Sequence, residues 1–177
     1  MRGLNEVGFA ANLSIGTLDE QAWRRSEPGT PHPKARVAAV RALRDAGIPC
    51  GVLVAPILPG ISDSPAQLRE VVRAVAEAGA THISPITLHL RPGVKEEFMP
   101  WLEREYPELV SDYQRMYRGS NAPKAVRETI ARRVQAAKRR YTPPHDPSPP
   151  SQEAAGRQLP PSPDSPPDPP TQLSLLD

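Results

Sequence analysis

The sequence has few of the residues on which metal and redox sites depend. Cys50 is the only cysteine in 177 residues, so no internal disulfide and no all-cysteine metal or iron–sulfur site can form within this chain. The four histidines are scattered along the chain, which does not favour a metal site: His32, His82, His89 and His145. Cys50 itself opens an apolar stretch and is predicted to be a small core residue.

Other common signals are missing as well. No apolar run approaches the ~18 residues of a membrane helix, and the N-terminus lacks the apolar core of a signal peptide. The sequence therefore predicts a cytoplasmic protein without a membrane partner. No carboxylate pair, nucleophile–base pair or phosphate-binding glycine pattern stands out, and Pro59-Gly60 is not a dinucleotide fingerprint.

Proline, by contrast, is abundant and unevenly placed. Of 24 prolines, 12 lie between Pro143 and Pro170, among Asp and Ser residues with almost no aliphatic side chains. Such a segment buries too little apolar surface to offset the entropy of ordering, so residues 142–170 are predicted to be a disordered linker after a folded part within residues 1–141. Residues 143–177 carry a net charge of −4 within a chain of net +2, which leaves a basic body and indicates a nucleic-acid partner.

The predicted fold is organised around residues 47–60, GIPCGVLVAPILPG. A continuous aliphatic run between turn residues is typical of a parallel strand covered on both faces. Pro56 cannot donate a ladder hydrogen bond, so we expect strand pairing to fade there and the chain to turn at Pro59-Gly60.

Elements on both sides complete an α/β pattern. We expect strands at residues 9–16 and 81–88, a helical turn at 19–27 and a helix from Pro33 to Gly47. Ser64 and Gln67 form a predicted capping box at the start of the next helix, which ends at Gly79. The order is βαβαβ, and crossover helices of this length favour parallel pairing.

Helices follow the third strand. They are predicted at residues 96–104, 109–117 and 123–140, and the last is strongly basic. Its cations could contact a phosphate backbone, or they could form an ordinary solvated face. Because no aromatic residues lie between the arginines, the pattern does not favour stacking on single strands.

The carboxyl edge of the three strands is the predicted functional surface, because ligands bind at that edge in parallel sheets. It would carry Ser14 and Thr17, then residues 56–63, then His89 and Arg91. The alternative is that these are ordinary polar loop residues.

The last residues, PTQLSLLD, place bulky leucines at the end of an otherwise apolar-poor segment. A short anchor on a flexible tether is typical of a linear peptide motif, although leucines can also cluster by chance. The peptide, residues 171–177, resembles the bacterial sliding-clamp-binding motif. That resemblance implies that Gln172 and Leu173 begin the motif, with Gln172 in a polar subsite, and that Leu175 and Leu176 fill a hydrophobic pocket.

Three stretches carry a family resemblance: LSIGTLDEQAWRRSEPGTPHPKAR, AGIPCGVLVAPILPGISDS and ISPITLHLRPGVKEEFMPWL. They resemble the carboxyl-terminal half of radical S-adenosylmethionine proteins related to spore photoproduct lyase, often labelled DNA repair photolyase-like. The resemblance covers about residues 7–140. It implies a partial (β/α)6 TIM-type barrel, of which this chain would supply the fourth, fifth and sixth strands. It also implies lyase-like chemistry on DNA with S-adenosylmethionine and a [4Fe-4S] cluster.

The resemblance further implies cofactor-binding positions. Ser14 and Arg36 would hold the ribose and carboxylate of S-adenosylmethionine, Glu27 is a further candidate, and Ala55 and Pro56 would pass beside the adenine. Photoproduct lyases also use a hydrogen-donating cysteine, but Cys50 falls at the wrong end of its strand. No catalytic residue or metal ligand is therefore assigned.

One departure from the family is large. The Cys-x3-Cys-x2-Cys motif is absent, and only about eight residues precede the first strand, so this chain alone would be inactive. We expect Met1 to lie inside a longer coding region, or the chain to work beside another. The alternative function is a non-catalytic adaptor that binds nucleic acid and the sliding clamp.

Overall fold

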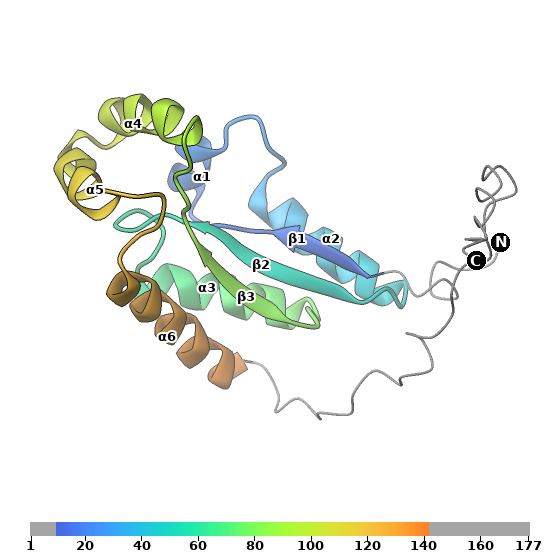
Figure 1. Cartoon of the computed structure of the whole chain (residues 1–177). Coiled ribbons are helices and arrows are strands. Elements are labelled where there is room, and N and C mark those ends of the chain that lie inside the picture. Colours follow the sequence, from blue (N-terminus) through green and yellow to red (C-terminus); the bar gives the residue numbers. More distant parts are fainter. Residues whose placement is uncertain (1–9, 142–177) are drawn as a thin grey trace, which may run out of the picture. The chain divides into compact units, whose positions relative to one another are not determined.

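A computed structural model describes residues 10–141 and shows a mixed α/β arrangement (Figure 1). Three strands alternate with helices, and further helices follow the last strand. The elements are β1 (Ala11–Ser14), α1 (Glu20–Ser26), α2 (Pro33–Asp45), β2 (Cys50–Ile57), α3 (Pro65–Glu77), β3 (Ile83–Thr87), α4 (Val94–Glu105), the 3-10 turn η2 (Pro107–Leu109), α5 (Val110–Met116) and α6 (Lys124–Tyr141). The predicted linker and terminal peptide lie outside the described residues.

The sheet has the order β1-β2-β3, and both strand pairs are parallel. In register, Leu13 lies opposite Val52, and Val52 lies opposite Ile83. This confirms the predicted parallel βαβαβ unit. The β2–β3 ladder shifts register between Val54 and Ile57, so pairing is interrupted at Ala55 and Pro56 as the missing proline N–H predicts.

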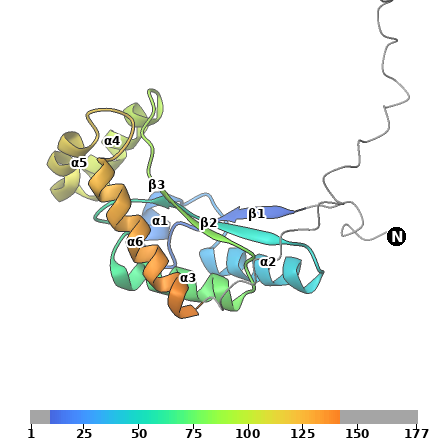
Figure 2. The ribbon, with the colours of Figure 1, turned by 60° about the horizontal axis from the view of Figure 1, so that its bottom comes forward.

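Helices α2, α3 and α6 all lie on one face of the sheet (Figure 2). They bury the side chains of Cys50, Val52 and Val54 in one apolar core, together with Val72 of α3 and Val134 of α6. These alternate residues of β2 point the same way because successive strand side chains point to opposite faces.

The opposite face of the sheet has no helix over it in the described residues (Figure 2). Asn12 and Ser14 are exposed there, and Leu53 is half-buried. The imidazole of His82 covers the backbone of Gly51 so closely that a Cβ at Gly51 would lie 1.9 Å from the ring. The prediction of a central strand covered on both faces therefore holds for one face only.

A second apolar cluster lies beyond the carboxyl ends of the strands, where α4 and α5 sit at one end of the sheet (Figure 1). Leu58 and Leu88, which follow β2 and β3, contribute to it with Leu102 of α4, Tyr113 of α5 and Tyr117, which follows α5. The helices after β3 thus pack on the same edge of the sheet where a ligand site was predicted.

The local signals placed the helix starts well. Pro33 and Pro65 are the first residues of α2 and α3, and the hydroxyl of Ser64 accepts a hydrogen bond from the Gln67 N–H at 3.2 Å. Only this half of the predicted capping box forms, because the Gln67 side chain bonds the Ser64 hydroxyl and the Ile61 carbonyl instead of the Ser64 N–H. The first strand is shorter than predicted, four residues from Ala11 to Ser14, and it pairs only with β2 among the described residues. No helix of the described residues is long and apolar enough to cross a membrane.

Candidate functional site

A cavity of about 290 Å³ opens at the carboxyl edge of the sheet. The segments that leave all three strands contribute to it, and α1 and α4 form its remaining walls. Its lining residues are Gly16, Thr17, Ala22, Ser26, Glu27, Pro56, Leu58, Ser62, Leu88, Val94, Glu97, Phe98 and Trp101. Because it combines apolar walls with a few polar groups at this edge, it is the best candidate for a ligand site in the described residues.

The exits of β1 and β2 approach each other at the floor of this cavity. A Cβ built on Gly16 would lie 2.7 Å from the Pro56 carbonyl oxygen and 3.2 Å from that of Ala55. Glycine is therefore the residue that lets the two backbones approach this closely. The carbonyls of Ala55 and Pro56 lie in the interrupted part of the ladder, directly beside the β1 exit.

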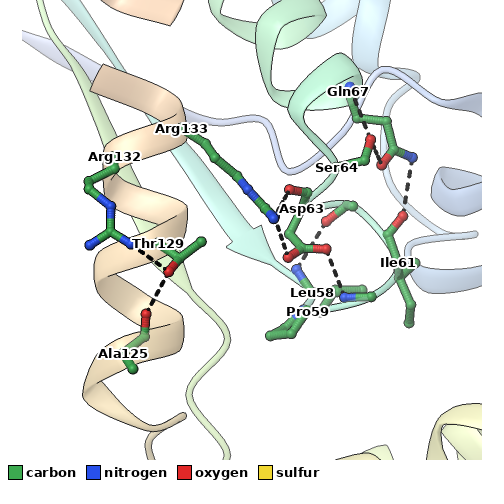
Figure 3. Close-up of polar contacts among 12 residues, drawn as sticks. Leu58, Pro59, Ile61, Asp63, Ser64, Gln67, Ala125, Thr129, Arg132 and Arg133 are labelled. Atoms are coloured by element: carbon green, nitrogen blue, oxygen red, sulfur yellow. Dashed lines mark hydrogen bonds and ion pairs between the residues drawn. The ribbon is translucent and has the colours of Figure 1, made fainter. Parts of the chain in front are cut away.

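The loop between β2 and α3 is held by several hydrogen bonds (Figure 3). The Ser62 hydroxyl accepts from the Leu58 N–H at 3.0 Å, and the Asp63 carboxylate accepts from the Gly60 N–H at 2.8 Å. Arg133 of α6 donates to the Asp63 carbonyl at 2.7 Å and to its carboxylate at 3.0 Å. Hydrogen bonds within the loop and from Arg133 of α6 thus hold in place the part of the cavity wall formed by Leu58 and Ser62.

Two buried tyrosines brace the same region. The Tyr113 hydroxyl donates to the Pro59 carbonyl at 2.8 Å, and the Tyr117 hydroxyl donates to the Leu88 carbonyl at 3.0 Å. Burial raises the pKa of both phenols, and for Tyr113 the neighbouring Tyr117 and Asp63 raise it further. Both hydroxyls therefore stay protonated and act as donors rather than as bases.

Arg36 is the centre of a polar cluster beside the cavity. Its guanidinium donates to the Ser14 carbonyl at 2.9 Å, the Pro31 carbonyl at 3.0 Å and the Thr30 hydroxyl at 2.8 Å, and it pairs with the Glu27 carboxylate. The side chains of Arg36 and Glu27 are 15% and 21% exposed. Arg36 thereby connects the exit of β1 to the proline-rich loop and fixes the position of Glu27.

One face of α4 forms the wall opposite the strand exits. Val94, Glu97, Phe98 and Trp101 follow the i, i+3, i+4, i+7 spacing, and all four line the cavity. The Trp101 indole donates to the Arg25 carbonyl at 2.8 Å, and the Phe98 ring stacks on Tyr113 with centroids 5.5 Å apart. These contacts hold both rings in place.

The structure brings together only part of the predicted site. Glu27 and Pro56 line the cavity, whereas Arg36 and Ala55 do not. Arg36 pairs with Glu27, and the Ala55 carbonyl lies beside Gly16 of the lining. Ser14 is not among the lining residues, and its hydroxyl lies on the open sheet face while its carbonyl contacts Arg36. Gln172, Leu173, Leu175 and Leu176 lie outside the described residues.

His89 and the cations of α6 lie elsewhere. The His89 ring is 2.8 Å from the Asn121 amide oxygen, and both residues line a separate shallow pocket with Arg127. Lys138 donates to the Ile83 carbonyl at 2.9 Å and Arg133 pairs with Asp63, so these two cations stabilise the fold. Lys124, Arg132 and Arg139 remain on an exposed stripe of α6.

The contribution of α4 was missed by sequence reasoning. The sequence predicted a helix at residues 96–104, but it singled out none of Glu97, Phe98 and Trp101 as a site residue. The signal was present in the spacing, because a carboxylate occupies the same helix face as Val94, Phe98 and Trp101. The helical periodicity shows which residues share one face of α4, but it does not show that this face lines a cavity.

Cys50 lies at the amino end of β2, away from the cavity lining, and its side chain is fully buried. Burial raises the pKa of the Cys50 thiol, with Arg44 as a smaller opposing influence. This confirms the prediction of a core residue. No group of three or more metal-ligating side chains occurs within residues 10–141.

Comparison with curated proteins finds relatives in mycobacteria and in an archaeal virus. The chain is 43% identical over 152 residues to uncharacterized proteins of Mycobacterium tuberculosis and Mycobacterium bovis, a match that covers 84% of this chain and 44% of each relative. It is 33% identical over 90 residues to an uncharacterized protein of the Acidianus two-tailed virus, which covers 49% of this chain and 30% of that protein. The chain thus spans less than half the length of the curated relatives it matches.

No family model and no solved structure matches the chain. The fold and the site define the protein as a mixed α/β protein with a small parallel sheet and a ligand-sized cavity at its carboxyl edge.

Proposed function

We propose that this chain is the substrate-side half of a radical S-adenosylmethionine enzyme that resembles spore photoproduct lyase and acts on DNA. The observation that carries the proposal is the cavity into which all three parallel strands open. The one-sided packing supports it, since in a barrel wall the helices lie outside and the inner face carries only side chains. On this view β1, β2 and β3 are the last three strands of a partial barrel.

The residues of the cavity fit the adenosine part of S-adenosylmethionine. An adenine ring needs apolar walls and an acceptor for its amino group. Leu58, Phe98 and Trp101 offer the walls, and the carbonyls of Ala55 and Pro56 lie beside the cavity outside the regular ladder. Arg36 acts here as a positioning residue, because its guanidinium is already engaged with the loop and Glu27.

The iron–sulfur cluster does not fit this chain, because a single buried cysteine cannot supply three thiolate ligands. When bound, the cluster and S-adenosylmethionine would supply abstraction of a hydrogen atom from the substrate. The residues of this chain would bind the adenosine, exclude water with the α4 wall and orient the loop after β2. The cluster must come from sequence beyond this chain, and the greater length of the mycobacterial relatives leaves room for it.

A DNA partner is supported by the exposed stripe on α6. Lys124, Arg132 and Arg139 lie there with Glu128, which pairs with Lys124 at 3.7 Å. Contacts of such cations with phosphates make DNA affinity depend on salt, and each contact adds about one unit to the slope of log affinity against log salt concentration.

Replacing Arg132 and Arg139 by alanine should weaken DNA binding at all sequences and lower this slope by about one to two. Arg24→Ala, which removes an exposed cation on α1, is the matched control and should leave the slope unchanged.

The same stripe favours the alternative function, a non-catalytic adaptor that brings a nucleic acid to the sliding clamp. The coding sequence upstream of Met1 separates the two. The enzyme proposal expects an in-frame Cys-x3-Cys-x2-Cys motif there, or in the gene of a chain that copurifies with this one. If neither gene contains such a motif and the native protein starts at Met1 by mass spectrometry, the enzyme proposal fails and the adaptor stands.

A further inference from the structure

We infer that the α4 wall of the cavity is a subsite for a positively charged group of the bound ligand, with Glu97 as the counter-charge. The inference rests on the proposed function, since it concerns the same cavity. The inference gives α4 a role in ligand recognition, which neither the sequence motifs nor its position relative to the strand ends had indicated. The ligand class is a monocationic organic molecule whose charge is a sulfonium or an ammonium group.

The first observation is the position of Glu97. It lines the cavity on the same face of α4 as Val94, Phe98 and Trp101, and it is exposed, so its carboxylate is open to a ligand. Glu97 makes no hydrogen bond or ion pair with any described residue. Its neighbour Glu96 already accepts from the Gly93 N–H at the helix start, so Glu97 is not needed as a cap.

The second observation is the sign of the lining charges. Two carboxylates, Glu27 and Glu97, line the cavity, and no lysine, arginine or histidine within residues 10–141 lines it. Glu27 is neutralised by its ion pair with Arg36. One uncompensated negative charge therefore remains, and it lies on the α4 side.

The third observation is the kind of surface around that charge. Phe98 and Trp101 are fixed by their contacts with Tyr113 and the Arg25 carbonyl, so they are already arranged before a ligand binds. Val94 is 41% exposed, one of two large hydrophobic side chains in residues 10–141 exposed to this degree. Aromatic rings beside a carboxylate attract organic cations, through the ring quadrupole as well as the charge. A ligand of net negative charge would meet Glu97 without a compensating cation among the lining residues, whereas the net charge of S-adenosylmethionine is positive.

Binding of three related probes to the full chain tests the inference. S-adenosylmethionine carries a sulfonium group beside the ammonium and carboxylate of its amino-acid end, S-adenosylhomocysteine has the same amino-acid end without the sulfonium, and adenosine carries no charged group. Glu97→Gln removes the charge and keeps the shape. It should weaken S-adenosylmethionine binding roughly fivefold in a calorimetric titration and leave adenosine binding unchanged. S-adenosylhomocysteine shows which charge Glu97 recognises, because Glu97→Gln should weaken its binding only if Glu97 recognises the ammonium group.

Glu103→Gln is the matched control, because it removes an exposed carboxylate from the same helix outside the cavity lining. Equal thermal midpoints of both variants exclude a folding defect. If Glu97→Gln changes the affinities of S-adenosylmethionine and adenosine equally, or changes neither, the cation subsite is wrong while the adenosine site stands. If none of the three probes binds the unaltered chain, both the subsite and the proposed cofactor site on this chain fail.

Discussion

Gly16 is the residue at which a single added methyl group should disturb the cavity floor. Alanine there would place its Cβ 2.7 Å from the Pro56 carbonyl oxygen and 3.2 Å from the Ala55 carbonyl oxygen. Both neighbours are backbone atoms of the central strand, so no flexible side chain can move away. Relief requires a shift of β1 or β2 relative to the other.

Overpacking of this kind costs about 1–3 kcal/mol. For a chain of this size that corresponds to a fall in the thermal midpoint of roughly 3–9 °C. Gly16→Ala should also weaken adenosine binding, because the displaced carbonyls lie at the cavity. Differential scanning calorimetry and urea unfolding measure the first effect, and titration with adenosine measures the second.

Gly29→Ala and Gly119→Ala are the controls. Neither glycine has a positive φ, and a Cβ at either would meet nothing within 4 Å. At such positions alanine is neutral or stabilises by up to about 1 kcal/mol, since it restricts the unfolded chain. If Gly16→Ala has the same midpoint as these two variants, the close approach of β1 to Pro56 is refuted.

Three further predictions concern the tyrosine brace, the cysteine and the terminal peptide. Tyr113→Phe leaves the Pro59 carbonyl without its donor and should lower the free energy of unfolding, measured in urea, by about 1–3 kcal/mol. The folded Tyr113 hydroxyl keeps its proton while the unfolded one ionises, so the stability of the unaltered protein should fall as pH rises above the ordinary phenol pKa of 10.0. The variant should lose less stability over this range, and an equal alkaline loss in both proteins would contradict the assignment. Cys50 should not react with a thiol reagent at pH 8 in the folded protein and should react once urea unfolds it, since the side chain is fully buried and its pKa is raised; fast reaction of the native protein would show that β2 is misplaced. A peptide of residues 168–177 should bind the bacterial sliding clamp, and Leu175→Ala with Leu176→Ala should abolish binding by fluorescence anisotropy; unchanged binding of the doubly substituted peptide would remove the clamp hypothesis.

Much of the fold could be predicted from local signals, because the same residues that set the periodicity also set the ends of elements. Pro33, Ser64 and Pro65 mark helix starts in the sequence and in the structure. Pro56 predicted the interruption of the β2–β3 ladder, since its missing N–H acts locally. The parallel order followed from the crossover lengths alone.

The site was less predictable, because it depends on contacts between residues far apart in the chain. Arg133 fixes Asp63 across 70 positions, and Trp101 contacts Arg25 across 76. Nothing in the spacing of a basic helix shows which arginine will turn inward. The sheet face without a helix was missed for a related reason. An aliphatic strand sequence looks the same whether helices cover both its faces or only polar side chains, here Asn12 and His82, lie over Gly51 on one of them.

Formation of 5′-deoxyadenosine tests the central claim most directly. The protein to assay is the full product of the gene that encodes this chain, together with any chain that copurifies with it, reconstituted with iron and sulfide without oxygen. With dithionite and S-adenosylmethionine we expect 5′-deoxyadenosine and methionine by liquid chromatography, and a clear loss of both when Pro56→Leu fills the strand-exit side of the cavity. A reconstituted protein with intact cluster absorbance that forms no 5′-deoxyadenosine would contradict the proposal.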